Sequence, residues 1–287
     1  MPTRKTKPSN GVRSRTRPLR SAPACNAAIG IFDSGIGGLT VAHAVMETLP
    51  RETIIYLGDT ARYPYGTKSA ETVRRYSIEN AEFLADKQIK MLVVACNTSA
   101  AVALDALRER FNIPVVGVIE PGAQAAVTAT RNRKVGVIAT DGTIASGAYT
   151  RALKQLDPKL EIYTRACPLF VPLAEEGWVD NDVARSTASS YLTSLKRSGI
   201  DTLVLGCTHY PLLANVIAEV MGPNVKLVDS AKTTAAAVRE TLLHEGLARR
   251  SGSGSVSFFV TDVPDRFVKA GGHFMGQRVE SAVRIER

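Results

Sequence analysis

Residues 90–98 read KMLVVACNT, and residues 201–209 read DTLVLGCTH. Each segment is an apolar run of strand length that ends in a small residue and a cysteine, and the small polar residues that follow suit the first turn of a helix. The two cysteines, Cys96 and Cys207, are 111 positions apart, which is about the length of one α/β domain. This repeat favours two domains of related build, each with one cysteine at the carboxyl end of a strand.

The same alternation of strands and helices extends along the chain from residue 27. Strand-like runs lie at 28–33, 53–58, 91–95, 115–119, 134–139, 160–164, 202–206, 225–228 and 256–260. Helical patterns lie at 70–86, 99–111, 123–130, 180–196 and 231–245. Strands that are apolar along their whole length are typical of parallel sheets covered by helices on both faces. We therefore expect an α/β fold of two similar domains, each with its own mainly parallel sheet.

Composition excludes several classes of protein. The chain has 287 residues, of which 45% are hydrophobic and 22% charged, so it can bury a full core. No apolar run approaches the roughly 18 residues that a membrane span needs. The four cysteines are too few for a disulfide scaffold, and with four scattered histidines they show no zinc-site spacing. We expect no metal and no membrane association.

The net charge of +9 is concentrated at the amino end. Residues 1–26 carry seven basic side chains and no acidic one, so the remaining 261 residues have a net charge of about +2. The segment is rich in proline and serine and cannot bury enough apolar surface to fold, so we expect a disordered basic tail. It lacks the apolar core of a secretory signal. A weak contact with a polyanion is the alternative function for this tail.

The position of Cys96 and Cys207 suits a reactive thiol. Open α/β sheets bind ligands at the carboxyl ends of their strands, and a helix that begins there favours negative charge through its dipole and its free N–H groups. Such surroundings lower the pKa of a thiol. The alternative is that both are small buried hydrophobic side chains. Cys25 lies in the tail and Cys167 lacks the strand-end context, so we expect neither to react.

Two loops after the first strands could bind a ligand. The segment IGIFDSGIGGLTV (29–41) turns sharply after Asp33, which could cap a helix or present its carboxylate to a cleft. The turn is neither a dinucleotide fingerprint nor a Walker loop. The segment GDTARYPYGTKS (58–69) is a polar loop with two tyrosines around a proline, and loops at this edge of a sheet commonly bind ligands.

Two further positions offer acid–base groups. Glu175 and Glu176 follow an apolar segment and could be a solvated charge pair or could face a site. His209 follows Cys207 by two residues and could be a structural donor or an acid–base partner near neutral pH.

Taken together, the motifs resemble those of bacterial glutamate racemases. The resemblance extends from about residue 29 to residue 276 and rests on motifs in the family's order: IGIFDSGIGGLTV (29–41), GDTARYPYGTKS (58–69), VVACNTSA (93–100), VVGVIEPG (115–122), VGVIAT (135–140), CPLFVPLAEEG (167–177), LGCTHYPLL (205–213) and LVDSA (227–231). Aspartate racemases resemble it less well.

This resemblance implies a racemase that needs no cofactor and moves the α-proton of glutamate between two cysteines. Cys96 would take the proton from D-glutamate while Cys207 donates to the opposite face, with the roles reversed for L-glutamate. Asp33 would assist Cys96, and Glu175 (preferred to Glu176 on the motif match) would assist Cys207 together with His209. The implied substrate contacts are Asp33, Ser34, Tyr65, Gly66, Asn97, Thr98, Thr208 and His209.

The resemblance also implies a domain division and a cellular setting. One domain would comprise residues 27–119 with 230–287, the other residues 120–229, and the active site would lie in the cleft between them. The product D-glutamate would supply peptidoglycan synthesis in the bacterial cytoplasm, which agrees with unpaired thiols. Many relatives are homodimers, and some are reported to bind DNA gyrase, so a nucleic-acid-linked role for the basic tail stays open.

Three alternatives remain on the sequence alone. An aspartate racemase would use the same chemistry on a substrate one methylene shorter. A hydrolase or transferase would use only Cys207 with His209 and would pass through an acyl-enzyme. A non-catalytic amino-acid-binding protein would bind a ligand in the same cleft without exchanging its α-proton.

Overall fold

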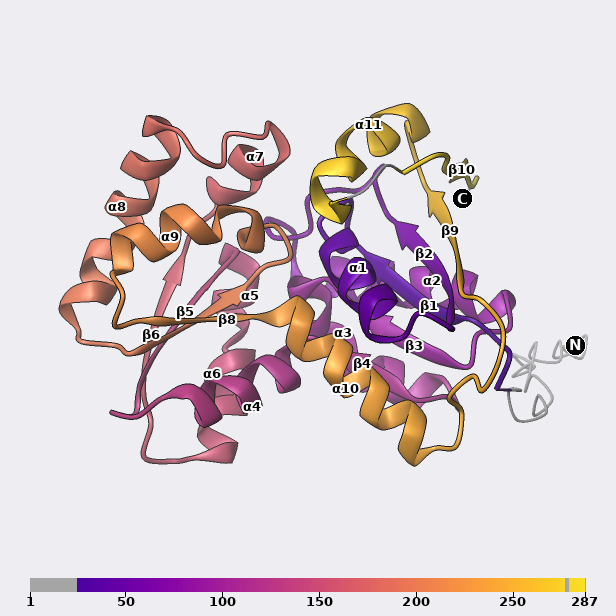
Figure 1. Ribbon diagram of the computed structural model, residues 1–287, viewed down its shortest axis with the longest axis horizontal. Helices are drawn as coiled ribbons and strands as arrows, with labels where there is room; N and C mark the ends of the chain where they lie inside the picture. The colour runs from indigo at the N-terminus through magenta and orange to yellow at the C-terminus, as the bar shows by residue number, and fades with distance from the viewer. Residues whose placement is uncertain (1–24, 277–278, 287) are drawn as a thin grey trace, which may run out of the picture.

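The computed structural model describes residues 25–276 and 279–286, and within them the strands form two separate sheets (Figure 1). All neighbouring strands in these sheets are parallel. The predicted α/β fold with mainly parallel sheets covered by helices is therefore confirmed. The tail 1–26 lies outside the described residues except for its last two positions, and its disorder stays a prediction.

Sheet A has the spatial order β10 (Val283–Arg284), β9 (Ser255–Val260), β2 (Thr53–Gly58), β1 (Ile29–Asp33), β3 (Met91–Val94), β4 (Val115–Gly117). Sheet B has the order β6 (Glu161–Ala166), β5 (Lys134–Ala139), β7 (Thr202–Gly206), β8 (Lys226–Asp229). The strands β1, β3 and β7 are buried along their whole length, as expected for strands covered on both faces.

Helices cover both faces of each sheet, as Figure 1 shows. Those around sheet A are α1 (Leu39–Thr48), α2 (Ala70–Asp86), α3 (Asn97–Arg110), α10 (Ser230–His244) and α11 (Pro264–Met275). Those around sheet B are α4 (Ile119–Ala129), α5 (Asp141–Ser146), α6 (Ala148–Leu156), α7 (Phe170–Glu175), α8 (Asp182–Arg197), the 3₁₀ helix η1 (Tyr210–Leu213) and α9 (Ala214–Met221). Helix α10 packs on α1 and also touches α4, so it joins the two halves. No helix in the described part of the chain is both long enough and apolar enough to cross a membrane.

Because of the strand register, the loops that carry the candidate site residues lie side by side at the carboxyl ends of the strands. In sheet A, Asp33 pairs with Gly58 and Phe32 with Val94, so β1, β2 and β3 end side by side. In sheet B, Ala139 pairs with Gly206, so β5 and β7 also end together. Parallel strands place their carboxyl ends at the same edge, and the loops that follow them therefore share a surface.

Two boundaries differ from the sequence prediction in ways that affect the cysteines. Helix α3 begins at Asn97, two residues earlier than expected, so Cys96 is its N-cap residue. Strand β6 runs to Ala166 instead of residue 164, so Cys167 also follows a strand directly. The prediction that Cys167 lacks a strand-end position was wrong, because β6 is a largely exposed edge strand whose mixed polar sequence shows no clear apolar run.

Candidate active site

A cavity of about 310 Å³ lies where the carboxyl ends of strands from sheet A and sheet B meet. Its walls come from the loops after β1, β2 and β3 on one side and after β5, β6 and β7 on the other. Ten of the eleven site residues predicted from the sequence line it: Ser34, Tyr65, Gly66, Cys96, Asn97, Thr98, Glu175, Cys207, Thr208 and His209. The eleventh, Asp33, is not part of the wall.

Cys96 and Asp33 form the part of the site that belongs to sheet A. Both are buried, and the Asp33 Oδ2 atom accepts a hydrogen bond of 2.9 Å from the Gly35 N–H. Burial, and then the charge of Asp33, raise the pKa of Cys96 to about 11. Burial also raises the pKa of Asp33. The expectation that the helix start lowers the pKa of this thiol was therefore wrong, because desolvation of the sulfur outweighs it.

Cys207 belongs to a chain of polar contacts on the side of sheet B. The Cys207 Sγ atom lies 3.9 Å from His209 Nδ1, and His209 Nε2 lies 3.2 Å from Glu175 Oε1. Burial alone would lower the pKa of His209, but the hydrogen bonds with Cys207 and Glu175 outweigh burial and raise it to about 10. Burial likewise opposes the charge on Glu175, and the hydrogen bond with His209 still lowers the pKa of that carboxyl. An imidazolium therefore faces the Cys207 sulfur and favours negative charge there. Glu176 is exposed and does not line the cavity.

The glycine-rich turn after β1 touches the Cys207 side directly. A Cβ atom built on Gly37 would lie 2.4 Å from two ring atoms of His209 and from the Thr208 hydroxyl. The Thr40 hydroxyl donates a hydrogen bond of 3.1 Å to the Thr208 carbonyl. Glycine is thus required at position 37 because sheet A and sheet B make contact at this point.

Asn97 presents free hydrogen-bond donors at the cavity. Its Oδ1 atom accepts a 2.7 Å hydrogen bond from the Tyr149 hydroxyl, which fixes the orientation of the amide. Its Nδ2 atom is buried and has no hydrogen-bond partner among the described residues. The Thr98 hydroxyl lies within 3.1 Å of the Thr140 and Thr143 hydroxyls, which join the start of α3 to the start of α5. This arrangement suits an anionic ligand, since a carboxylate would accept from the Asn97 amide.

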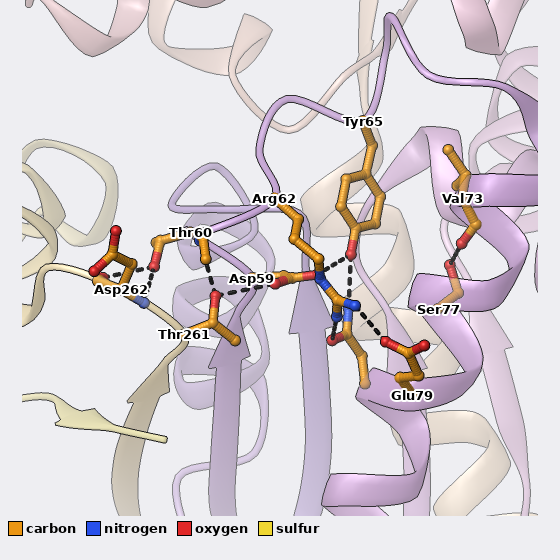
Figure 2. Close-up of polar contacts among 11 residues, drawn as sticks. Asp59, Thr60, Arg62, Tyr65, Val73, Ser77, Glu79, Thr261 and Asp262 are labelled. Atoms are coloured by element: carbon orange, nitrogen blue, oxygen red, sulfur yellow. Dashed lines mark hydrogen bonds and ion pairs between the residues drawn. The ribbon is translucent and has the colours of Figure 1, made fainter. Parts of the chain in front are cut away.

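The loop after β2 is held by a polar network, which Figure 2 shows. The Tyr65 hydroxyl donates to Asp59 and accepts a 3.0 Å hydrogen bond from Asn80. The buried Asp59 carboxylate also accepts from Thr261 (3.0 Å) and from the Arg62 guanidinium (2.7 Å). Because its hydroxyl is used in this network, Tyr65 offers a ligand mainly its ring and its backbone.

Eight wall residues are not among the site residues named from the sequence: Tyr63, Pro64, Thr67, Thr140, Asp141, Pro168, Val171 and Pro172. The first three belong to the loop 58–69, which was expected to bind a ligand. Thr140 and Asp141 follow the buried strand β5, so the rule that placed Cys96 and Cys207 at strand ends applied to them as well. The residues after β6 gave no such signal. Across residues 25–276 and 279–286, no group of three His, Cys, Asp or Glu side chains is arranged to hold a metal ion.

Comparison with known proteins gives concordant matches. A family model described as Asp/Glu/Hydantoin racemase matches residues 39–238. A glutamate racemase of Geobacter metallireducens is 58% identical over 259 residues, which cover 90% of this chain and 96% of that protein. A crystal structure of a glutamate racemase from Bacillus anthracis superimposes with a TM-score of 0.88 at 41% identity and covers 91% of this chain and 97% of that one. One from Francisella tularensis, in complex with D-glutamate, gives a TM-score of 0.86 at 38% identity, with 91% and 98% coverage. These matches agree with a cavity that is lined by one strand-end cysteine from each sheet. This chain therefore belongs to the Asp/Glu/Hydantoin racemase family and, within it, to the bacterial glutamate racemases.

Proposed function

We propose that this racemase interconverts L- and D-glutamate by moving the α-proton between Cys96 and Cys207. The observation that carries the proposal is that the two cysteines come from different sheets and line one cavity. Inversion at a carbon requires removal of a proton from one face and addition to the other, which two separate acid–base groups achieve most simply. Cys96 takes the α-proton of D-glutamate while Cys207 donates to the other face, and the roles reverse for L-glutamate. The D-glutamate bound in the Francisella tularensis relative supports this choice of substrate.

The buried partners assist each cysteine in turn. Asp33 is buried, and its charge raises the pKa of the Cys96 thiol, which supports its assignment as the group that assists Cys96. On the other side, the Glu175–His209 pair stabilises charge on the Cys207 sulfur. In the substrate-free protein Cys96 is therefore a thiol at neutral pH, and the His209 imidazolium lies beside the Cys207 sulfur.

Acid–base catalysis alone does not account for the reaction, because the α-proton of an amino-acid carboxylate is very weakly acidic. Each well-placed acid or base supplies about 10²–10⁴-fold. The rest comes from orientation and from donors aimed at developing charge in a site with little water. In this proposal the substrate carboxylates accept hydrogen bonds from the free Asn97 Nδ2 donor and from the hydroxyls of Ser34 and Thr208, which line the cavity. Tyr65, Gly66, Thr98 and His209 complete the proposed contacts from the cavity wall. The contact expected from Asp33, which is not part of the wall, stays a prediction.

The domain division and the cellular role belong to the same proposal. Strands from 29–117 and 255–284 form sheet A and those from 134–229 form sheet B, which supports two domains, 27–119 with 230–287 and 120–229, that close over the substrate. D-glutamate from this enzyme would enter peptidoglycan synthesis in the cytoplasm. A homodimer and a contact of the basic tail with DNA gyrase or nucleic acid stay predictions.

The test of this function is the fate of D-glutamate in D₂O, followed by NMR and circular dichroism. We expect deuterium at the α-carbon and decay of the optical signal without any added cofactor. Thermal stabilisation by glutamate without α-proton exchange would instead identify a binding protein. Faster turnover of D-aspartate than of D-glutamate would contradict the substrate assignment.

A Gly37→Ala substitution is expected to lower kcat/KM for racemisation by about 10²-fold, the size of effect that a shift of about 1 Å in a catalytic group produces. The added methyl group would overlap the His209 ring and push it from Cys207. A matched control is Gly122→Ala in α4, where an added Cβ makes only an ordinary contact of 3.4 Å. Equal activity of the two variants in a circular dichroism assay would show that the contact between the turn and His209 is unimportant.

A further inference from the structure

Tyr63 lies at the wall of the cavity but is neither one of the two cysteines nor one of the groups proposed to assist them. It belongs to the loop after β2, and its half-buried side chain lines the cavity opposite residues of sheet B. Its neighbour Tyr65 uses its hydroxyl in the Asp59 network. Tyr63 does not take part in that network, and its neighbours are His209 and Glu175.

The Tyr63 ring packs against the imidazole of the Cys207 side. The two rings are stacked, with centroids 6.3 Å apart and planes inclined by 26°. On the other side of the phenol, a Cβ atom built on Gly35 would lie 3.0 Å from a Tyr63 ring carbon. A second aromatic ring, that of Phe274, meets the His209 imidazole edge-on at 5.3 Å between centroids. The imidazole is thus confined by aromatic rings from the sheet A side.

The Tyr63 hydroxyl also acts on Glu175, the carboxylate that bonds His209, and lowers the pKa of that carboxyl as a hydrogen-bond donor would. Burial, and then the charge of Glu175, raise the pKa of Tyr63 far above its usual value, so its hydroxyl stays protonated and acts as a donor. The same phenol therefore touches two successive members of the chain that leads to the Cys207 sulfur. It reaches them from sheet A, whereas Glu175 and His209 belong to sheet B.

We propose that Tyr63 is a positioning residue for the Cys207 half of the reaction, because its hydroxyl orients Glu175 and its ring holds the His209 imidazole toward the sulfur. Tyr63 acts through these two residues and exchanges no proton with the substrate. Since it comes from the opposite sheet, it aligns the pair only when the two sheets are brought together around the cavity. This inference rests on the proposed two-cysteine function.

The decisive variant is Tyr63→Phe, which keeps the ring and removes only the hydroxyl. Loss of one hydrogen bond to a charged group is expected to lower kcat/KM about 10-fold. The groups that act on the Glu175 carboxylate are Tyr63, His209 and Arg266 of α11. Tyr63 stabilises the ionised form, so its removal raises the pKa of Glu175. The acidic limb of the pH profile of kcat/KM is then expected to move to higher pH, a shift that a purely structural role would not produce.

A double-mutant cycle with Glu175→Gln tests the route of the effect. If Tyr63 acts through Glu175, adding Tyr63→Phe to Glu175→Gln lowers kcat/KM by less than about twofold. The matched control is Tyr163→Phe, which removes a 2.8 Å tyrosine–glutamate hydrogen bond to Glu161 on the exposed edge strand β6 and should leave the profile unchanged. The two enantiomers have equal free energy, so the equilibrium constant is 1 and kcat/KM must be the same for D- and L-glutamate in every variant. Measuring both directions therefore provides an internal check on the kinetic data.

Two results would overturn the inference: a Tyr63→Phe enzyme with wild-type kcat/KM and an unmoved acidic limb, or a full 10-fold loss that persists beside Glu175→Gln. Failure of the proposed function itself has a different signature, since it would leave Cys96→Ala or Cys207→Ala active. Inactive Cys96→Ala and Cys207→Ala variants together with a normal Tyr63→Phe variant would refute the role of Tyr63 alone.

Discussion

Replacement of Cys96 or Cys207 by alanine is expected to lower kcat/KM for racemisation by about 10⁴-fold, the upper part of the range for one acid–base group. A methyl group can neither accept nor donate the α-proton. Serine in either position would retain only a trace of activity. Its hydroxyl can still exchange a proton, but it is a far poorer acid–base group than a thiol near neutral pH. The measurement is the decay of the circular dichroism signal of each enantiomer.

Exchange of the α-proton in D₂O distinguishes the two cysteines. In the Cys96→Ala enzyme, Cys207 can still remove a proton from L-glutamate and return deuterium to the same face, so slow exchange without inversion is expected for L-glutamate only. Cys207→Ala should show the converse, with exchange of D-glutamate only. The pair of variants thus assigns each sulfur to one face of the substrate.

Cys167→Ala is the matched control, because Cys167 is also buried and also follows a strand, yet it does not line the cavity. Its activity should stay within a few-fold of wild type. An active Cys96→Ala enzyme that accumulates an acyl-enzyme would instead support the single-cysteine hydrolase or transferase that the sequence left open. Exchange of both enantiomers at wild-type rates in either alanine variant would also contradict the two-base mechanism.

The elements that the sequence predicts best are those whose pattern is set locally. Strands 53–58 and 202–206 and helix 70–86 have the predicted bounds, since each is a continuous apolar run or a clear amphipathic period between turn residues. Helix α11 was missed because Gly271 and the glycine after it weaken its helical pattern. Its formation depends on packing against α1.

The positions of the site residues could be predicted where a motif coincides with the end of a strand. Properties that depend on burial, such as the pKa of a thiol, could not. The rule for strand ends located Cys96 and Cys207, whereas the pKa of Cys96 depends on how completely the folded chain excludes water from the sulfur. The contact of Tyr63 with Glu175 joins positions from different sheets and has no local signal in the sequence. Tertiary proximity of this kind follows from the whole fold, so single-sequence patterns do not reveal it.

A buried ion pair at the amino ends of the strands of sheet A also could not be predicted from local sequence patterns. Lys90 and Glu52 precede β3 and β2, where charged residues usually face water, yet both side chains are almost completely buried. The Lys90 ammonium donates to the Cys25 carbonyl (2.6 Å), the Glu52 carboxylate (2.5 Å) and the Leu247 carbonyl (2.8 Å). The other Glu52 oxygen accepts from the Arg249 N–H at 2.8 Å. The pair therefore fastens both the start of the fold and the segment after α10 to sheet A.

A Lys90→Met substitution is expected to lower the free energy of unfolding by about 3–5 kcal/mol, because it leaves the Glu52 carboxylate buried without its counter-charge. Urea titration measures the change as a lower midpoint at constant slope. The folded fraction should keep its kcat/KM within about twofold, since the pair lies at the amino ends of the strands and the cavity lies at their carboxyl ends. A Lys90→Met/Glu52→Leu double variant should recover part of the loss, because it removes the orphaned charge.

Sheet B supplies the matched control for this prediction. Lys134 and Glu161 occupy the corresponding starts of β5 and β6, but their side chains are 36% and 58% exposed and their charged atoms are 3.9 Å apart. Lys134→Met should therefore lower the free energy of unfolding by no more than about 1 kcal/mol. Similar small losses at both pairs would mean that Lys90 and Glu52 are solvated in the folded protein. A large loss at Lys90 alone would show that desolvation, and not the mere presence of an ion pair, determines the stability at this edge of the fold.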